Sequence, residues 1–304
     1  MKTVLITGAA GYLGSHLAKT FKLDGWKVVG FGHKRHTMNH YIDVMHYGDI
    51  RDRELLESLF HNIHFDLVVH AAARIEAGIS VNEPTEFYDV NTGGTTNLLN
   101  VMTHHGVKNI IFCSTAAVYK TQNRPIKEED DIANNSPYGF SKYLAEEAIK
   151  ASKLNYVILR LGSVYGYSED NTRMNIMPNL FSKISSLNGT INLFSGGKQL
   201  KSLVSVYDVA RCFKFMADNK INNQIFNLSN ENTTVKKVAH ILKKINPRLK
   251  IQTNNYPIPN LGYTLSNKKL LKYKFKFLYN LKKCLEDMHE KWSTKNKFVN
   301  KLEY

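Results

Sequence analysis

The chain has 304 residues, of which 43% are hydrophobic and 22% are charged, and its formal net charge at pH 7 is +15. This size suits one large domain or two modest ones, and the composition is that of a globular protein, not of a disordered or collagen-like chain. No uncharged apolar stretch reaches the roughly 18 residues of a membrane span, and the first residues lack the apolar leader of a signal peptide. Three widely spaced cysteines (Cys113, Cys212 and Cys284) exclude a disulfide framework and a four-cysteine zinc site, and we therefore expect a cytoplasmic protein.

The first two thirds of the chain alternate short apolar runs with longer helical patterns. Residues 3–6, 27–31, 66–70, 110–113 and 157–161 are short, branched and apolar, as strands buried on both faces are, and 224–228 could add a late strand. Helices are predicted at 12–23, 53–60, 85–105 and 137–154. Alternation of strand and helix is typical of right-handed crossovers and of an α/β fold with a Rossmann-type, doubly wound parallel sheet.

The pattern loosens after about residue 165, where Asn, Gly and Pro separate shorter elements. We therefore expect a larger domain over 1–165, to which 203–229 returns. Residues 166–202 and 230–304 would form a smaller lobe interwoven with it.

A glycine-rich turn directly follows the first predicted strand. Gly8, Gly11 and Gly14 are spaced by three residues, and Tyr12 and Leu13 begin the next predicted helix. Glycines at such a turn let the backbone approach a pyrophosphate, and the helix N-terminus offers free N–H groups and a partial positive charge. A turn kept only for packing would contain similar glycines, but the strand before it and the helix after it favour dinucleotide binding by these five residues.

The loop after the second predicted strand contains His33, Lys34 and Arg35. A carboxylate there would hold the adenosine ribose of NAD, and none is present. Lys34 and Arg35 suit the 2′-phosphate of NADP, although a merely solvated basic loop would look the same. We expect NADP or NAD as the cofactor, with NADP slightly favoured.

The ends of the next two strands offer further cofactor contacts. Asp49 and Ile50 follow the third strand, where a carboxylate can take the adenine amine. Ala71, Ala72 and Ala73 follow the fourth strand, and their small side chains either leave space for the cofactor or simply pack tightly.

Tyr138 and Lys142 lie four residues apart in a predicted helix, so both side chains share one face. A tyrosine has an ordinary pKa of about 10, which a neighbouring ammonium group and an oxidised nicotinamide would lower into the range for proton transfer. Tyr279 and Lys283 repeat the spacing. Only Tyr138 follows a strand that ends at Thr115, on the sheet edge where ligands bind.

These motifs in this order resemble the extended short-chain dehydrogenase/reductase family, the NAD(P)-dependent sugar-nucleotide epimerases, dehydratases and reductases. The likeness covers nearly the whole chain and rests on Thr7-Gly8-x-x-Gly11-x-x-Gly14, His70-Ala71-Ala72-Ala73, Asn91-Thr92-Gly93-Gly94-Thr95, Ser114-Thr115-Ala116-Ala117-Val118-Tyr119 and Tyr138-x-x-x-Lys142. The resemblance implies a catalytic tetrad of Asn91, Thr115, Tyr138 and Lys142. Tyr138 would exchange a proton with the sugar hydroxyl while a hydride passes between sugar and nicotinamide, and Thr115 would bind the same oxygen. Lys142 would hold the ribose.

The resemblance favours the 4-epimerase branch of this family. Ala116 and Ala117 stand where the dehydratases have an Asp-Glu pair. Asn175 and Lys201 match positions that contact the substrate diphosphate, although Lys201 replaces an arginine and keeps only its charge. We expect epimerisation at C4 of a nucleotide sugar through a transient 4-keto intermediate. An NADPH-dependent 4-keto sugar-nucleotide reductase and a non-catalytic NADPH-sensing relative are the alternatives.

The expected partners follow from the same resemblance. It implies a nucleotide-sugar substrate and a homodimer formed through the helices predicted at 85–105 and 137–154. Lysines concentrate late in the chain, at 268–283, without a nucleic-acid motif around them. We expect neither nucleic acid nor a membrane as a partner, and the sequence identifies no metal ligand.

Overall fold

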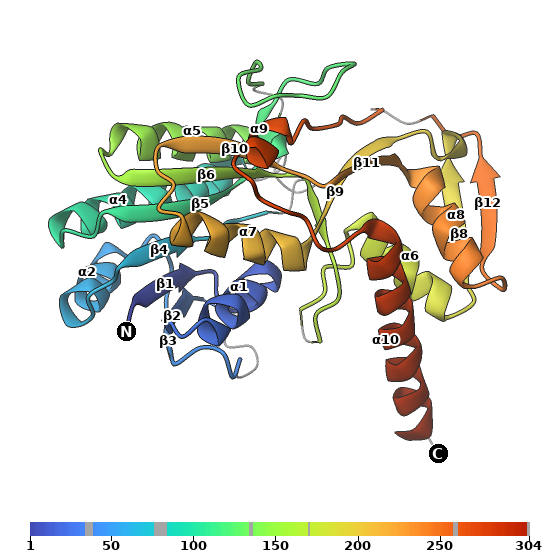
Figure 1. The fold of residues 1–304 in the computed structure, drawn as a ribbon, viewed down its shortest axis with the longest axis horizontal. Helices are drawn as coiled ribbons and strands as arrows, with labels where there is room; N and C mark the ends of the chain where they lie inside the picture. The colour runs from blue at the N-terminus through green and yellow to red at the C-terminus, as the bar shows by residue number, and fades with distance from the viewer. Residues whose placement is uncertain (34–38, 76–83, 134–135, 170, 258–260, 303–304) are drawn as a thin grey trace. The chain divides into compact units, whose positions relative to one another are not determined.

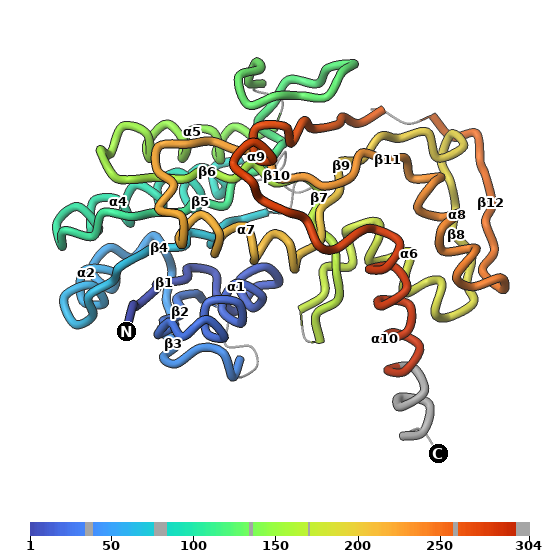
Figure 2. The backbone as a smooth tube through the Cα atoms, in the orientation of Figure 1, coloured from blue at the N-terminus to red at the C-terminus, as the bar shows by residue number. Residues whose placement is uncertain are grey.

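A computed structural model describes residues 1–33, 39–75, 84–133, 136–169, 171–257 and 261–302 of the chain. The chain forms two compact units, and Figure 2 traces its backbone. The first comprises Met1–Lys120, Lys127–Leu161 and Ala210–Asn227, and the second comprises Thr121–Ile126, Gly162–Val209 and Leu228–Tyr304. The domain limits expected from the sequence stay a prediction. Within the described ranges, no helix combines the length and apolar character needed to cross a bilayer.

The first unit is built on a seven-stranded sheet with the strand order β10-β6-β5-β4-β1-β2-β3 (Figure 1). Its strands are β1 (Thr3–Thr7), β2 (Lys27–Gly32), β3 (Val44–Tyr47), β4 (Leu67–His70), β5 (Asn109–Thr115), β6 (Asn155–Leu161) and β10 (Gln224–Leu228). The pairs β1–β2, β1–β4, β2–β3, β4–β5 and β5–β6 are parallel. The chain moves outward from β1 to β3 and returns at β4 on the other side of β1. The carboxyl ends of β1 and β4 therefore form the switch point where ligands bind in such sheets.

Helices cover both faces of this sheet (Figure 1). They are α1 (Tyr12–Leu23), α2 (Arg53–Asn62), α3 (Pro84–Phe87), α4 (Gly94–His104), α5 (Pro137–Ala151) and α7 (Val206–Asp218). One core cluster joins α2, α4 and α5 to alternate strand residues such as Leu5, Val68 and Ile110. Val4 and Val69 are equally buried, and strand periodicity turns them to the other face.

The α/β fold with a doubly wound parallel sheet is confirmed, and one predicted helix is wrong in detail. The sequence predicts a single helix over 85–105, whereas the structure contains α3, a π-helix η1 (Tyr88–Gly93) and α4 in succession. Thr92, Gly93, Gly94 and Thr95 are poor formers of a regular helix interior, so this stretch favours an irregular turn. The wider π turn sets the direction of Asn91, which lies inside it.

The second unit contains two small sheets. Strands β7 (Ser163–Tyr165), β9 (Leu200–Ser205) and β11 (Glu231–Thr234) form one, and β8 (Thr190–Phe194) pairs with β12 (Lys250–Asn254) in the other. The helices are α6 (Met177–Ser186), α8 (Val235–Ile245), α9 (Lys268–Lys272) and α10 (Leu281–Leu302). A 3-10 turn, η3 (Ser195–Gly197), follows β8, and another, η2 (Ala116–Val118), follows β5 in the first unit. Tyr165, Leu203, Leu242, Leu285 and Trp292 belong to the core cluster of this unit.

Candidate active site

In the glycine turn between β1 and α1, the backbone at Gly8 packs closely against the end of β2 and against the first turn of α1. Gly8 has φ = +72°, and its N–H donates to the Phe31 carbonyl at 2.7 Å. A Cβ at Gly14 would lie 2.1 Å from the Gly8 carbonyl oxygen, so only glycine fits there. Gly11 is the N-cap of α1 and has no side chain to occupy the N–H groups of the first turn, which also lacks acidic residues. This cradle fits a pyrophosphate.

Asp49 lies directly after β3 and is held by its neighbour Arg51. Its carboxylate accepts hydrogen bonds from the Arg51 backbone N–H, Nε and Nη2 at 2.9, 2.9 and 2.6 Å. These bonds and the positive charge of Arg51 lower the pKa of Asp49. Ile50 is buried against Gly94 at the start of α4, where a Cβ would lie 2.4 Å from its methyl group. Asp49 therefore presents a fixed, ionised carboxylate.

Of the three residues predicted in the adenosine loop, the structure describes one. His33 is exposed immediately after β2, and its charge contributes to the lowered pKa of Asp49. Lys34 and Arg35 lie outside the described residues. At the end of β4, on the other side of β1, three half-exposed side chains follow the strand, namely Ala71, Ala72 and Ala73.

A buried histidine links β1, β4 and α4 at the switch point. The Nδ1 atom of His70 lies 2.7 Å from Thr7 Oγ1, and its Nε2 atom lies 2.9 Å from Thr95 Oγ1. Thr95 already donates its hydroxyl proton to the Asn91 carbonyl, so His70 carries its proton on Nε2 and accepts from Thr7 on Nδ1. Burial lowers the pKa of His70 to about 3, which keeps the ring neutral. This hydrogen-bond network fixes the ends of β1 and β4 relative to α4, at the edge where the cofactor is predicted to bind.

Asn91 is fully buried, and protein groups satisfy its amide. Its Oδ1 accepts from the Arg74 N–H at 2.8 Å, and its Nδ2 donates to the Arg74 carbonyl at 3.1 Å and to Ser141 Oγ at 3.0 Å. Ser141 in turn donates to the Tyr138 carbonyl at 2.9 Å. Asn91 therefore ties the segment after β4 to the first turns of α5.

The first turn of α5 is pressed against the end of β5. Ser136 caps the helix by accepting the Gly139 N–H at 3.1 Å. A Cβ at Gly139 would lie 2.3 Å from the Ala117 carbonyl oxygen, so glycine is required for this approach. Thr115, which accepts the Ala117 N–H at 3.2 Å, is thereby brought beside the helix that carries Tyr138.

Lys142 lies one turn beyond Tyr138 and is 2% exposed. Its Nζ atom sits 3.9 Å from the centroid of the Phe112 ring, a cation–π contact. Burial lowers the pKa of Lys142 to about 8, although Cys113 and Glu146 act in the opposite direction. The edge-to-face partner of the Tyr138 ring is Phe87, at 6.4 Å between centroids. A phenol and a dry ammonium group on one face of a helix can move a proton to and from a bound hydroxyl.

A buried ion pair behind this face was not found by sequence reasoning. Arg160 on β6 binds Glu146 on α5, with Nη2 to Oε2 at 2.6 Å and Nε to Oε1 at 3.1 Å. Glu146 also accepts a hydrogen bond from Ser114, and Arg160 stacks on Tyr119 at 4.7 Å. The sequence did offer one indication of this pair: Glu146 lies four residues after Lys142, on the same helix face.

The two predicted substrate contacts lie in the second unit. Asn175 is exposed just before α6, and Lys201 is half-buried on β9, where burial lowers its pKa. The buried asparagine of this segment is Asn179, whose Oδ1 accepts the Gly166 N–H and whose Nδ2 donates to the Arg173 carbonyl, both at 2.9 Å. Asn179 holds the α6 segment in place, and Asn175 is left to face outward.

Comparison with solved structures shows the same fold. The X-ray structure of Pal from Bacillus thuringiensis is 26% identical, with a TM-score of 0.84 and coverage of 96% of this chain and 99% of that one. The UDP-glucose 4-epimerase of Bifidobacterium longum in complex with NAD⁺ and UDP is 24% identical, with a TM-score of 0.85 and coverage of 97% and 99%.

Sequence comparison extends over the same length. UDP-glucose 4-epimerase 4 of Oryza sativa subsp. japonica is 28% identical over 338 residues, which cover 98% of this chain and 91% of that protein. The family model for the NAD-dependent epimerase/dehydratase family matches residues 4–229, which contain the glycine turn, the switch point and α5. The chain is therefore an enzyme that belongs to the NAD-dependent epimerase/dehydratase family.

Proposed function

We propose that the enzyme inverts C4 of a nucleoside-diphosphate hexose, and UDP-glucose is the first substrate to test. The observation that carries this proposal is the placement of Tyr138 and the dry ammonium group of Lys142 on one turn of α5, pressed against the strand that ends at Thr115. Similarity to proteins named UDP-glucose 4-epimerase supports it. Ala116 and Ala117 leave this strand end without the acid–base pair that dehydration needs.

The glycine cradle and the switch point fit a nicotinamide dinucleotide, which when bound supplies a hydride acceptor and donor. Tyr138 would take the proton of the C4 hydroxyl as the C4 hydride leaves, which gives the 4-keto sugar. It would return the proton after the hydride reaches the opposite face, so the reaction has no net redox change. Thr115 would hydrogen-bond the C4 oxygen, and the charge of Lys142 would favour the phenolate. Asn91 acts by positioning α5.

The experiment measures stoichiometry. Purified enzyme with UDP-glucose should form UDP-galactose while the absorbance of reduced nicotinamide stays constant. Tyr138→Phe should lower turnover by about 10²–10⁴-fold, the scale of general acid–base catalysis, and should leave cofactor binding intact. Tyr279→Phe, at the second copy of the spacing, is the matched control and should change turnover little. Oxidation of one NADPH per sugar would favour the 4-keto reductase instead, and full activity of Tyr138→Phe would reject the assigned proton carrier.

The choice between the two cofactors is a separate proposal. Lys34 and Arg35 favour NADP by their charge, whereas the Bifidobacterium longum relative was solved with NAD⁺. Changing both residues to Ala should weaken NADPH binding by about 1–3 kcal/mol, the range for hydrogen bonds to charged groups, and leave NADH binding unchanged. Titration of both cofactors by fluorescence or calorimetry checks this. Equal losses for the two cofactors, or tighter binding of NADH by the unmodified enzyme, would reject the preference for NADP.

We also propose that the enzyme works as a homodimer in a reducing, cytosolic compartment. The outward face of α5 offers half-exposed apolar side chains, namely Phe140, Tyr143 and Leu144. Cys113, Cys212 and Cys284 form no disulfide with one another, which agrees with the proposed compartment.

A further inference from the structure

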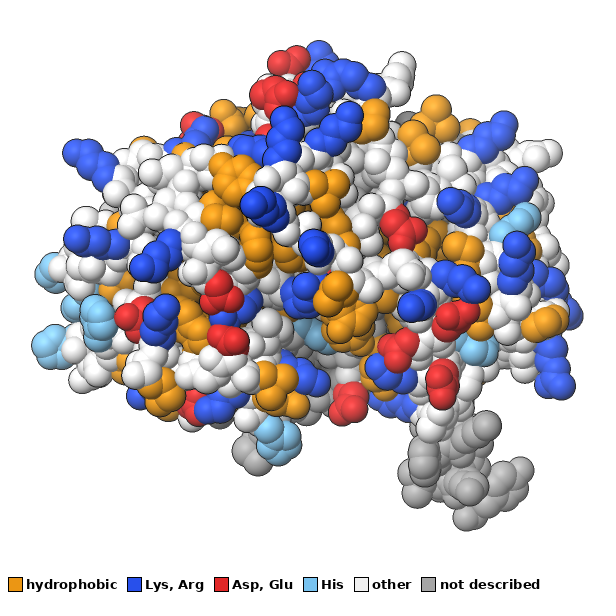
Figure 3. Space-filling model, viewed as in Figure 1, with side chains coloured by type: hydrophobic (Ala, Val, Ile, Leu, Met, Phe, Trp, Pro, Cys, Tyr) orange, Lys and Arg blue, Asp and Glu red, His pale blue; other side chains and the backbone are white. Residues whose placement is uncertain are grey.

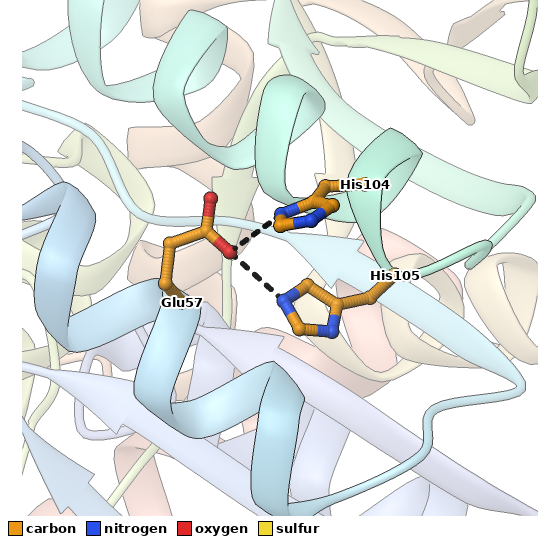
Figure 4. A group of neighbouring side chains, drawn as sticks. All are labelled: Glu57, His104 and His105. Atoms are coloured by element: carbon orange, nitrogen blue, oxygen red, sulfur yellow. Dashed lines mark hydrogen bonds and ion pairs between the residues drawn. The ribbon is translucent and has the colours of Figure 1, made fainter.

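In the first unit, three side chains of the kinds that bind metal ions lie close together. They are away from the glycine turn and from the face of α5 that carries Tyr138. Glu57 lies in the middle of α2, and His104 and His105 end α4 (Figure 4). Glu57 Oε2 lies 3.0 Å from His104 Nδ1 and 2.8 Å from His105 Nε2. Two imidazole nitrogens from adjacent residues therefore point at a single carboxylate oxygen.

The spacing of these atoms is close to that of a zinc coordination shell. The three donor atoms lie within 4.8 Å of one another. Zn–N and Zn–O bonds of about 2.0–2.2 Å in a tetrahedron place neighbouring donors about 3.3 Å apart. Both Glu57–histidine distances lie within about 0.5 Å of this spacing, and the exposed His104 ring is the group that would turn to complete it. The side chain of His104 is 70% exposed, against 20% for His105 and 26% for Glu57. Solvent can therefore enter and supply a water as the fourth ligand.

The surroundings favour a cation between these groups. His104 lies in the last turn of α4 and His105 is its C-cap, where the helix dipole places partial negative charge. Arg53, one turn earlier on α2, lies 3.5 Å from the other oxygen, Oε1, and leaves Oε2 to the histidines. Its positive charge opposes a bound cation, but its side chain is 58% exposed, so water screens that charge.

We propose that Glu57, His104 and His105 form a binding site for Zn²⁺ or a similar imidazole-seeking divalent ion, completed by water. The ion would replace the two N–H···O hydrogen bonds with three metal–ligand bonds. Each neutral imidazole would bind it through the nitrogen that now faces Glu57 and carry its proton on the other ring nitrogen. It would link α2 to the end of α4, since Glu57 and His104 are 47 residues apart in the sequence. Mg²⁺, which prefers oxygen ligands in an octahedron, would not compete.

The test measures Zn²⁺ binding to chelator-treated full-length protein that carries no polyhistidine tag, by equilibrium dialysis near neutral pH. The wild type should bind one more Zn²⁺ per chain than His104→Ala or Glu57→Gln, each of which should lower the affinity by about 100-fold or more. His61→Ala removes an exposed histidine one turn along α2 and is the matched control. Its binding should equal that of the wild type, and millimolar Mg²⁺ should displace no zinc.

Two further measurements separate this site from surface binding elsewhere. Zn²⁺ should raise the thermal midpoint of the wild type and of His61→Ala, by linkage, and leave that of His104→Ala unchanged. X-ray absorption of the zinc-loaded protein should show two imidazole nitrogens and oxygen at about 2.0–2.2 Å. Unchanged zinc stoichiometry and affinity in His104→Ala and Glu57→Gln, or sulfur in the coordination shell, would overturn the proposal.

Discussion

Lys142 is a cation that the fold holds at a thermodynamic cost. It is 2% exposed, and burial lowers its pKa from 10.5 to about 8. Below about pH 8 the lysine is charged in both the folded and the unfolded chain. The free energy of unfolding is then lowered by the full cost of burying the charge. Between about pH 8 and pH 10.5 the unfolded chain holds a proton that the folded chain has lost, and the free energy of unfolding rises with pH.

Lys142→Met should therefore stabilise the cofactor-free protein while abolishing activity. A shift of about 2.5 pK units corresponds to roughly 3 kcal/mol, which sets the upper limit of the gain near pH 7. The gain should shrink towards zero near pH 10.5, where the wild type no longer buries a charge. Urea unfolding of both proteins at several pH values measures the difference directly. A gain that is the same at pH 7 and pH 10 would show that packing against Phe112, and not charge, sets the stability.

Sequence reasoning can single out candidate residues where local context is sufficient, and their catalytic role stays a prediction. Tyr138 and Lys142 could be singled out because a strand end precedes them, and the sequence alone distinguished them from Tyr279 and Lys283. The partners of Asn91 could not be found this way. Its hydrogen bonds reach residue 74 in one direction and Ser141 in the other, and only tertiary packing brings these segments together.

At the scale of elements, α5 is fixed to the sheet by charge as well as by apolar packing. The Arg160–Glu146 pair joins β6 to α5 with both side chains almost fully buried, at 4% and 0% exposure. Lys150 and Glu147 form a second pair on the outer side of α5, where their side chains are 34% and 41% exposed. The same helix therefore offers a buried ion pair and an exposed one for comparison.

Arg160→Met should destabilise the protein by about 3–5 kcal/mol, because it leaves the Glu146 carboxylate buried without its cation. Combining it with Glu146→Leu should restore most of the loss, since no uncompensated charge is then left in the core. Glu147→Gln, on the exposed side, should cost less than about 1 kcal/mol. Denaturant midpoints of the wild type, these three variants and Glu146→Leu alone give these values. Additive losses in the double variant would contradict the account.

The elements also show where periodicity is insufficient. Buried strands and the helices α1 and α2 follow from apolar spacing and turn residues, and their predicted bounds agree with the structure to within about two residues. The signal at η1 is weaker, because the Thr-Gly-Gly-Thr run at 92–95 disfavours a regular helix but does not specify a π turn. The small strands of the second unit were not predicted either. They are short, partly polar and separated by strained turns such as Ser195, at φ = +46°, and Gly196.

At the scale of the whole molecule, charge and long-range contacts are the features that sequence describes least well. The net charge of +15 does not say where on the surface the basic residues gather. On the face drawn in Figure 3, the basic side chains lie scattered among acidic and polar ones. Glu57 and His104 are similarly far apart in sequence, and no ligand motif connects them. Adjacent parallel strands place α2 and α4 side by side, and the cluster results from that topology.

The last prediction concerns assembly. Tyr143 and Leu144 face outward on α5, and the rings of Tyr143 and Phe140 lie 6.1 Å apart, which makes a half-exposed apolar surface on this helix. A homodimer formed through α4 and α5 would bury that surface, so the wild type should sediment at twice its 34.7 kDa mass. Leu144→Glu places a charge in the contact and should give monomers, because an unpaired buried charge is strongly unfavourable. Ser58→Glu, on the exposed side of α2, introduces the same charge away from the contact and should leave the dimer intact. Sedimentation equilibrium at micromolar concentration distinguishes these outcomes, and a monomeric wild type would reject the dimer.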